Sequence, residues 1–202
     1  MKIIDVSQHN GVIDWTQVVA DAVIIRIGYR GYSGSGNLVL DSQFWNNYNG
    51  AKAKGLKVGI YYLSQAVTLQ EGVDEVSWII HTLDWKPLDL PVFIDSEWSN
   101  NKHTGRADSL SPAERTAITV KWCETVKAHN YSAGVYASTS WFNTHLTFSQ
   151  LQKYTIWCAQ YASSCKLSHY DYWQYSSKNT MPGIKGYVDV SKPYQPAYPF
   201  VS

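Results

Sequence analysis

The chain has 202 residues, of which 45% are hydrophobic and 16% charged, a balance that indicates one folded globular domain and excludes a disordered chain. The net charge is +1 and no basic run occurs, so nucleic acid is not an expected partner. No apolar stretch reaches membrane-spanning length and the N-terminus shows no signal-peptide region, so we expect no membrane partner.

Apolar segments of strand length recur along the whole chain. They predict eight strands, at residues 3–6, 22–28, 57–63, 92–97, 133–137, 154–160, 170–175 and 187–190. The second segment is apolar on both faces, which is typical of a strand in a parallel sheet. Residues 29–39, rich in Gly and Ser, and the polar residues 99–110 are predicted to be loops.

Helix-capping residues follow each of the first four strands, and a short helix is also expected after the fifth. Asp14 and Asp41 have the character of N-caps, and Thr68 and Ser111 each precede a Glu by three residues, the spacing of a capping box. The sequence therefore predicts helices at 15–20, 42–54, 69–86, 112–129 and 140–146.

The alternation of strands and helices predicts a parallel α/β sheet. Eight strands favour a closed barrel over an open doubly wound sheet, and the glycines between residues 28 and 36 match neither a dinucleotide nor a phosphate motif. The last three strands lie too close together for full helices, so the predicted fold is an irregular TIM-like (β/α)5(β)3 barrel. We expect one domain over residues 1–191, with 192–202 as a tail or the start of a linker.

Two carboxylates stand at the end of the fourth strand, in the stretch Pro91-Val-Phe-Ile-Asp-Ser-Glu97. If the strand continues through both, Asp95 and Glu97 share one face, with carboxyl carbons roughly 6–7 Å apart. Cleavage of a glycosidic bond uses two carboxyl groups at such a spacing, one of which gives a proton. A direct carboxylate nucleophile would need a shorter separation, about 5–5.5 Å.

Functional groups of an α/β barrel collect where the strands end. The strand ends of this chain carry further acids, aromatic residues and two amides, namely Asp5, Tyr61, Tyr62, Tyr136, Gln160, Tyr161, Trp173, Gln174 and Asp189. Trp and Tyr also outnumber Phe, with 9 Trp and 15 Tyr against 5 Phe, and their rings suit stacking on sugars. The pattern predicts an acidic cleft that binds carbohydrate.

Seven segments of the chain, in order, resemble glycoside hydrolase family 25, the Chalaropsis-type lysozymes and phage endolysin muramidases. They are Asp5-Val-Ser-Gln-His-Asn-Gly, Ile60-Tyr-Tyr, Pro91-Val-Phe-Ile-Asp-Ser-Glu, Gly134-Val-Tyr-Ala-Ser, Trp157-Cys-Ala-Gln-Tyr, Trp173-Gln-Tyr-Ser-Ser and Gly186-Tyr-Val-Asp-Val. The resemblance spans residues 3–191. It implies an irregular barrel of five helices and eight strands, and hydrolysis of the β-1,4 bond from N-acetylmuramic acid to N-acetylglucosamine in peptidoglycan.

The resemblance also implies roles for the four acids. Glu97 matches the family's proton donor, and Asp95 matches the second catalytic acid. Asp95 would either activate a water molecule, which gives inversion, or orient the substrate's 2-acetamido group as the nucleophile, which gives retention. Asp5 and Asp189 match two further acids that would hold the cluster by hydrogen bonds and charge.

Roles of the remaining residues stay open at this stage. Tyr61 or Tyr62 is expected to contact the sugar, depending on the phase of its strand. For Tyr136, Gln160 and Trp173, sugar contact and core packing are both open. Arg26 lies in the middle of a strand, and we expect it to form a salt bridge with one of the acids in the barrel.

No cofactor is expected, because no metal-ligand spacing and no nucleophile elbow occur in the sequence. Cys158 and Cys165 can meet, but three sparse cysteines favour free thiols. The leading hypothesis is a monomeric peptidoglycan muramidase, as a phage or prophage endolysin that is released at lysis, or as a secreted enzyme. The alternatives are a non-catalytic sugar-binding barrel and a glycosidase for another N-acetylated glycan.

Overall fold

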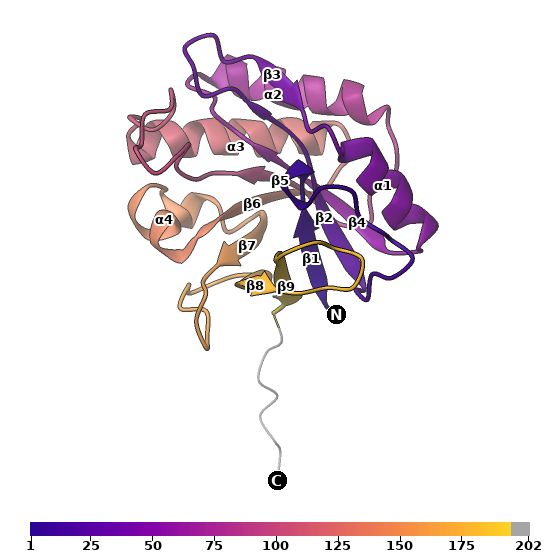
Figure 1. Cartoon of the computed structure of the whole chain (residues 1–202). Helices are drawn as coiled ribbons and strands as arrows, with labels where there is room; N and C mark the ends of the chain where they lie inside the picture. The colour runs from indigo at the N-terminus through magenta and orange to yellow at the C-terminus, as the bar shows by residue number, and fades with distance from the viewer. Residues whose placement is uncertain (195–202) are drawn as a thin grey trace.

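Nine strands and four α-helices form within residues 1–194, the part of the chain that the computed structural model describes (Figure 1). The strands are β1 (Ile3–Val6), β2 (Ala22–Arg30), β3 (Leu38–Leu40), β4 (Lys57–Leu63), β5 (Val92–Asp95), β6 (Ala133–Ser138), β7 (Thr155–Ala159), β8 (Tyr172–Asn179) and β9 (Val188–Pro193). The helices are α1 (Phe44–Ala53), α2 (Leu69–Leu83), α3 (Pro112–Ala128) and α4 (Thr139–Thr144), with 3₁₀ turns η1 (Gln8–Asn10) and η2 (Phe148–Gln150).

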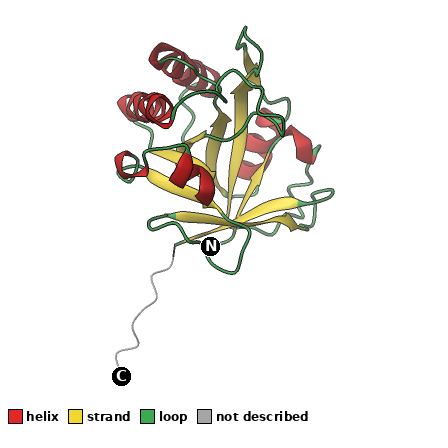
Figure 2. Ribbon diagram, turned by 90° about the vertical axis from the view of Figure 1, so that its left-hand side faces the viewer, coloured by secondary structure: helices red, strands yellow, loops and turns green. Residues whose placement is uncertain are grey.

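Eight of these strands close into a barrel. The hydrogen-bonded order is β1-β9-β8-β7-β6-β5-β4-β2, and pairing of β1 with β2 closes the circle. Strand β3 lies outside the circle as an antiparallel partner of β2. Figure 2 shows the strands in the interior with the helices outside them. The prediction of a closed α/β barrel is therefore confirmed.

One barrel strand runs against the others. Strand β9 pairs antiparallel with both β8 and β1, whereas all the other neighbours in the barrel are parallel. Only a short connection joins β8 to β9, and an antiparallel pair needs no helical crossover. The start of β9 consequently lies at the same rim as the ends of the parallel strands.

The helices cover only part of the barrel. Helix α1 contacts β2 and β4, α3 contacts β5 and β6, α4 contacts β6, and α2 packs on α3. No α-helix follows β7 or β8 within residues 1–194, so the predicted incomplete ring of helices is confirmed (Figure 1). None of the helices in this part of the chain is long and apolar enough to span a membrane.

The helix predicted at residues 15–20 is wrong. Asp14 does accept a hydrogen bond from the Thr16 backbone N–H at 3.1 Å, but only a turn follows. The segment is short, and the β-branched Val18 and Val19 lower its helix propensity further. The chain uses this segment instead to bury Trp15 and Val18 against the barrel.

Several predicted boundaries also differ, among them the end of β8, which lies at Asn179 and not at residue 175. Residues 29–39 are not all loop, because β2 continues to Arg30 and pairs with β3. Strand β5 ends at Asp95, so Glu97 lies in the loop after it and not on the strand. Strand β9 continues to Pro193, past the predicted domain end at residue 191. Of the predicted tail or linker, residues 195–202 lie outside the described residues.

The capping predictions for α3 are confirmed. Ser111 and Glu114 form a complete capping box at its start, with Pro112 in the first turn. After its end, Asn130 adopts a φ of +63°, a left-handed conformation that Asn tolerates better than most residues. Helix α3 thereby returns the chain to β6 at a fixed angle.

Alternation along the strands separates two apolar layers. One layer fills the barrel and consists of Ile3, Ala22, Ile24, Phe93 and Trp157, with Tyr61, Tyr136 and Tyr172 packed against it. The other lies between the strands and the helices. The next inward position beyond the filled layer is polar on several strands, and this change in composition creates the candidate site.

Candidate active site

Four acids meet at the rim of the barrel above its apolar filling. Asp5 comes from β1, Asp95 from the last position of β5, Glu97 from the following loop and Asp189 from β9. Asp5 and Asp189 are directly paired across the antiparallel β1–β9 ladder. Asp5 and Asp95 are buried, with 7% and 4% of their surface exposed, whereas Glu97 is accessible.

Asp5 and Asp189 behave as a pair. Burial raises the pKa of Asp5 well above its ordinary value, and the adjacent charge of Asp189 raises it further. Burial also raises the pKa of Asp189, while the hydrogen bond with Asp5 opposes that rise. Asp5 is buried and Asp189 half-buried, so ionising one carboxyl makes ionising the other more costly, and their titrations are coupled.

Burial and neighbouring charges also act on the pKa of Asp95, but in opposing directions. Burial and the charge of Glu97 raise its pKa, whereas the Arg26 guanidinium lowers it. Arg26 does not form the predicted salt bridge with an acid of the cluster: its Nε donates to Asp41 Oδ2 at 2.7 Å. Asp41 is itself fully buried, which makes it the better partner for a buried guanidinium.

Glu97 is the accessible acid of the four. Surrounding protein groups reduce its hydration, and this together with the Asp189 carboxylate raises its pKa to about 6. A carboxyl group with this pKa is partly protonated near neutral pH. It can therefore give a proton to a bound molecule and take one back.

The Gln174 amide, which the sequence placed at the rim without assigning it a catalytic or binding role, organises the cluster. Gln174 donates from Nε2 to Asp5 Oδ2 at 2.9 Å, and its Oε1 accepts from both Tyr136 and Tyr161 hydroxyls at 2.9 Å. An ionised Asp5 only accepts, so it orients the amide with its N–H₂ toward Asp5 and leaves Oε1 to the two hydroxyls, which can donate. The alternation of Tyr172, Trp173 and Gln174 along β8 was the available signal, since Tyr172 faces the barrel filling.

Alternation along β4 places Tyr61 and Tyr62, the two candidates for sugar contact, on opposite faces of the sheet. Tyr61 packs inside the barrel against Trp157, and burial raises its pKa well above the ordinary value. Tyr62 faces the helices, with none of its surface exposed and its ring 5.8 Å from that of Trp78. Tyr61 alone is therefore placed beside the carboxylates.

Gln160 and Trp173 lie at different depths. Gln160 Oε1 accepts from Thr139 Oγ1 at 2.9 Å, and the residue lines the cleft. Trp173 is on the outer face of β8, under Lys192, and its Nε1 donates to the Gln160 carbonyl at 2.8 Å. Trp173 thus supports the cleft wall from behind instead of facing the cleft.

Two cavities adjoin Glu97. The larger, about 610 Å³, is lined by Glu97, Tyr136, Ser138, Thr139, Ser140, Asn143, Ala159, Gln160 and Tyr161. The smaller, about 380 Å³, is lined by Glu97, Trp98, Asn100, Asn101, His103, Ser138, Ser140, Trp141 and His145. Glu97, Ser138 and Ser140 border both, so the accessible acid stands between two hollows of one cleft.

Neither cavity contains a cluster suited to a metal ion. Within residues 1–194, no three His, Cys, Asp or Glu side chains are arranged to hold one. The three cysteines are free thiols, with the Cys158 and Cys165 sulfurs 3.4 Å apart.

A sequence profile described as glycosyl hydrolases family 25 matches residues 4–184. The chain belongs to this family. An autolytic lysozyme of Clostridium acetobutylicum is 26% identical over 195 residues, which cover 95% of this chain and 55% of the relative. The chain spans between 55% and 66% of the length of the curated relatives it matches.

Solved structures of similar proteins agree with family 25 membership. The modular autolysin LytC from Streptococcus pneumoniae, solved with a synthetic peptidoglycan ligand, superimposes with a TM-score of 0.84 at 29% identity. That match covers 96% of this chain and 46% of LytC. A lysozyme from Streptomyces coelicolor shares the fold, with a TM-score of 0.79 at 22% identity over 98% of this chain and 93% of its own.

Proposed function

We propose that the chain is a peptidoglycan hydrolase, an N-acetylmuramidase that cuts the β-1,4 bond between N-acetylmuramic acid and N-acetylglucosamine. The observation that carries the proposal is an accessible Glu97 with a pKa of about 6, beside a buried Asp95. Membership in family 25 and the lysozyme and autolysin relatives support the choice of substrate.

In the proposed mechanism Glu97 gives its proton to the glycosidic oxygen as the bond breaks. Asp95 stays ionised and accepts the N–H of the 2-acetamido group, whose carbonyl oxygen then attacks the sugar carbon. Burial raises the pKa of Asp95, and the Arg26 guanidinium opposes that rise and so favours the charged form. Glu97 afterwards removes a proton from water, which opens the cyclic intermediate with retention.

The second mechanism that the sequence left open is inversion, in which Asp95 activates water directly. The expected spacing of about 6–7 Å came from strand geometry, which does not extend to Glu97 because β5 ends at Asp95. Product stereochemistry, followed by NMR of the newly formed anomer, distinguishes the two. Retention is the expected result.

Asp5, Asp189, Tyr61 and Tyr136 have supporting roles in this proposal. Asp5 and Asp189 titrate as a coupled pair and place a negative field beneath the sugar that becomes positively charged. Tyr61 and Tyr136 form the floor next to them. A purely sugar-binding barrel would not require this set of mutually destabilising carboxyls. The endolysin role stays a prediction.

Digestion of purified peptidoglycan, followed by borohydride reduction and mass spectrometry, tests the function. We expect fragments that end in reduced muramic acid. Fragments that end in reduced glucosamine would mean that the other glycosidic bond is cut. Wall binding without any fragments would favour the binding-module alternative, and cleavage of chitin at a comparable rate would favour a broader glycosidase.

Gln174→Leu is expected to lower kcat/KM on peptidoglycan by about 10- to 100-fold, because a hydrogen bond to a charged group contributes about 1.5–3 kcal/mol. The variant removes the donor to Asp5 and the acceptor for Tyr136 and Tyr161. Gln150→Leu, at an exposed position in η2, is the matched control and should leave kcat/KM unchanged. Equal activities of the two variants would exclude a positioning role for Gln174.

A further inference from the structure

The smaller of the two cavities, which we call the Trp98 cavity, has a different chemistry from the carboxylate cluster. Its lining groups are those of the 380 Å³ hollow described above, two imidazoles, two amides, two hydroxyls and two indoles, with Glu97 at the border. Imidazole, amide and hydroxyl groups all offer N–H or O–H donors. The same groups also carry acceptor atoms, so a ligand with both N–H and carbonyl groups, as in a peptide, is the match for such a lining.

Stacked rings fix the two imidazoles of the Trp98 cavity. His103 lies flat on Trp98, with centroids 3.9 Å apart and planes at 8°, and His145 lies on Trp141 at 4.1 Å and 11°. The two indoles meet edge to face at 4.7 Å. On the other side of this cluster, Arg115 lies 4.8 Å from the Trp141 ring centre.

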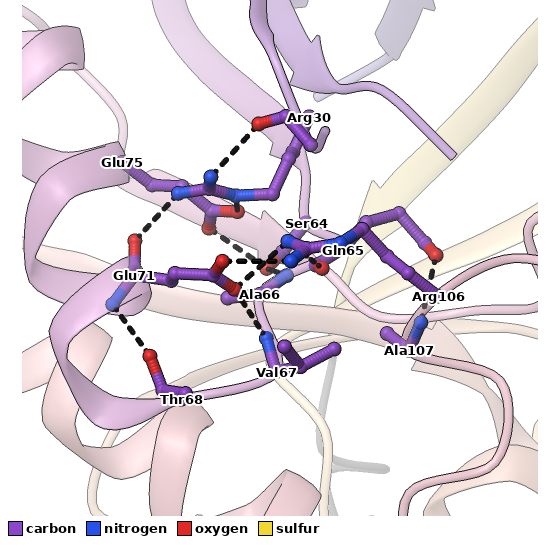
Figure 3. A network of polar contacts seen from close by, with 11 residues as sticks. Arg30, Ser64, Gln65, Ala66, Val67, Thr68, Glu71, Glu75, Arg106 and Ala107 are labelled. Atoms are coloured by element: carbon purple, nitrogen blue, oxygen red, sulfur yellow. Dashed lines mark hydrogen bonds and ion pairs between the residues drawn. The ribbon is translucent and has the colours of Figure 1, made fainter. Parts of the chain in front are cut away.

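The wall that carries Trp98 and His103 is built before any ligand arrives. Asp108 closes the loop by accepting from the Ser99 and Gly105 backbone N–H groups at 3.1 and 2.8 Å. Arg106 then holds the loop to α2 through two bonds to Glu71, at 2.8 and 2.7 Å (Figure 3). A wall fixed in this way reduces the entropy lost on binding.

The two ends of the cleft differ in charge. Gln174, Tyr136 and Tyr161 connect the larger cavity to Asp5 and its partner Asp189, so carboxylates dominate that end. In the Trp98 cavity the acidic lining group is Glu97, and the Arg115 guanidinium lies behind Trp141. An anionic substituent is repelled by the first end and tolerated at the second.

We propose that the Trp98 cavity binds the peptide attached to the lactyl group of the muramyl sugar, through its amide and carboxylate oxygens. The proposal rests on the proposed function, since a muramidase holds the muramyl carbon next to its proton donor. The peptide on that same sugar must then leave the cleft within a few ångströms of Glu97, where two cavities begin. The larger one accommodates sugar rings, and the Trp98 cavity receives the peptide.

Calorimetric titration with N-acetylmuramic acid and with muramyl dipeptide tests this directly. The two probes share one sugar and differ in the dipeptide, and neither contains a glycosidic bond that the enzyme can cut. We expect the wild type to bind muramyl dipeptide at least about fivefold more tightly, as one or two net hydrogen bonds would give. The ratio should fall to about one in variants of the cavity wall.

Two variants alter the cavity wall with little strain. His103 has a φ of +53°, so His103→Asn introduces a residue that tolerates this conformation. Asn101→Ala is preferred to a change at Asn100, whose side chain accepts from the Lys102 backbone N–H at 2.8 Å and shapes the loop. Asn49→Ala, at an exposed position on α1, is the control.

The outcomes separate the peptide site from the activity. Equal affinity of the wild type for both probes would overturn the peptide site, and so would an equal loss for both probes in the variants, which would mark a sugar subsite. If peptidoglycan is not cut although muramyl dipeptide is preferred, the proposed hydrolysis fails and the peptide site stands. If peptidoglycan is cut without any preference between the probes, only the peptide site fails.

Discussion

Glu97→Gln is expected to lower kcat on peptidoglycan by about 10²- to 10⁴-fold, the range over which a positioned general acid contributes. The amide has nearly the same size and keeps the border between the two cavities, but it has no proton to give. KM should change little, because the lost interaction belongs to the transition state. Rates are measured from the release of reducing ends.

The pH profile gives an independent test of the same role. Glu97 must be protonated to act, and its pKa is about 6, so wild-type kcat should fall as the pH rises through about 6. The proposed mechanism also requires an ionised Asp95, so kcat should fall again towards acidic pH, where this carboxyl takes up a proton. Burial raises the pKa of Asp95, and the Arg26 guanidinium opposes that rise. The residual activity of Glu97→Gln should lack the alkaline fall. If this fall persists in the variant, another group is the proton donor.

Glu114→Gln is the control for the loss of a carboxylate as such. Glu114 is exposed in the capping box of α3, away from the residues that line either cavity. Its substitution should leave kcat and the pH profile as they are. Circular dichroism and thermal melting of Glu97→Gln should match the wild type, since Glu97 is accessible and lies in a loop.

The barrel could be predicted from the sequence because the features that determine it are local along the chain. Apolar runs of strand length and capping residues such as Thr68 and Ser111 repeat along the chain, and the late segments leave no room for helices. The rim position of Asp5 and Asp95 follows from the same reasoning, since each stands at a strand end. Local pattern therefore sufficed for the architecture and for part of the acidic cluster.

What the sequence did not predict depends on contacts between distant segments. The antiparallel direction of β9, which brings Asp189 opposite Asp5, is set by pairing partners that lie far away in the chain. Arg26 pairs with Asp41 and not with an acid of the cluster, and Asp41 lies beside it only once the β2–β3 hairpin has formed. Gln174 lies in the segment Trp173-Gln-Tyr-Ser-Ser, but its role appears only with the two tyrosines around it.

A second large effect is expected on stability, at the network shown in Figure 3. Arg30 Nε donates to Glu75 Oε1 at 2.8 Å, and the Glu75 side chain has none of its surface exposed. Ser64 Oγ donates to the second carboxyl oxygen at 2.8 Å. Arg30 also reaches the carbonyls of Gly36 and Glu71, so it ties the β2–β3 hairpin to α2.

Arg30→Met should reduce the free energy of unfolding by about 3–5 kcal/mol at pH 8, the usual cost of removing one partner of a buried ion pair. Burial raises the pKa of Glu75 to about 7 even with Arg30 present, so its ionised form is the costly one. The contribution of Glu75 to the free energy of unfolding has its full value below pH 4.5 and is lost as the pH rises through about 7. Without Arg30 the carboxyl stays protonated at pH 5, and the loss there should be smaller.

Denaturant unfolding of the wild type and Arg30→Met at both pH values measures this difference. Lys52→Met is the matched control, because Lys52 and Asp89 form an ion pair whose side chains are 34% and 41% exposed. Such a pair contributes about 0–1 kcal/mol, so its loss should be small at either pH. A penalty for Arg30→Met that is the same at pH 5 and pH 8 would mean that Glu75 does not take up a proton in the variant. The ion pair would then contribute through the contacts of Arg30 with the hairpin and α2 carbonyls, and not through the charge of Glu75.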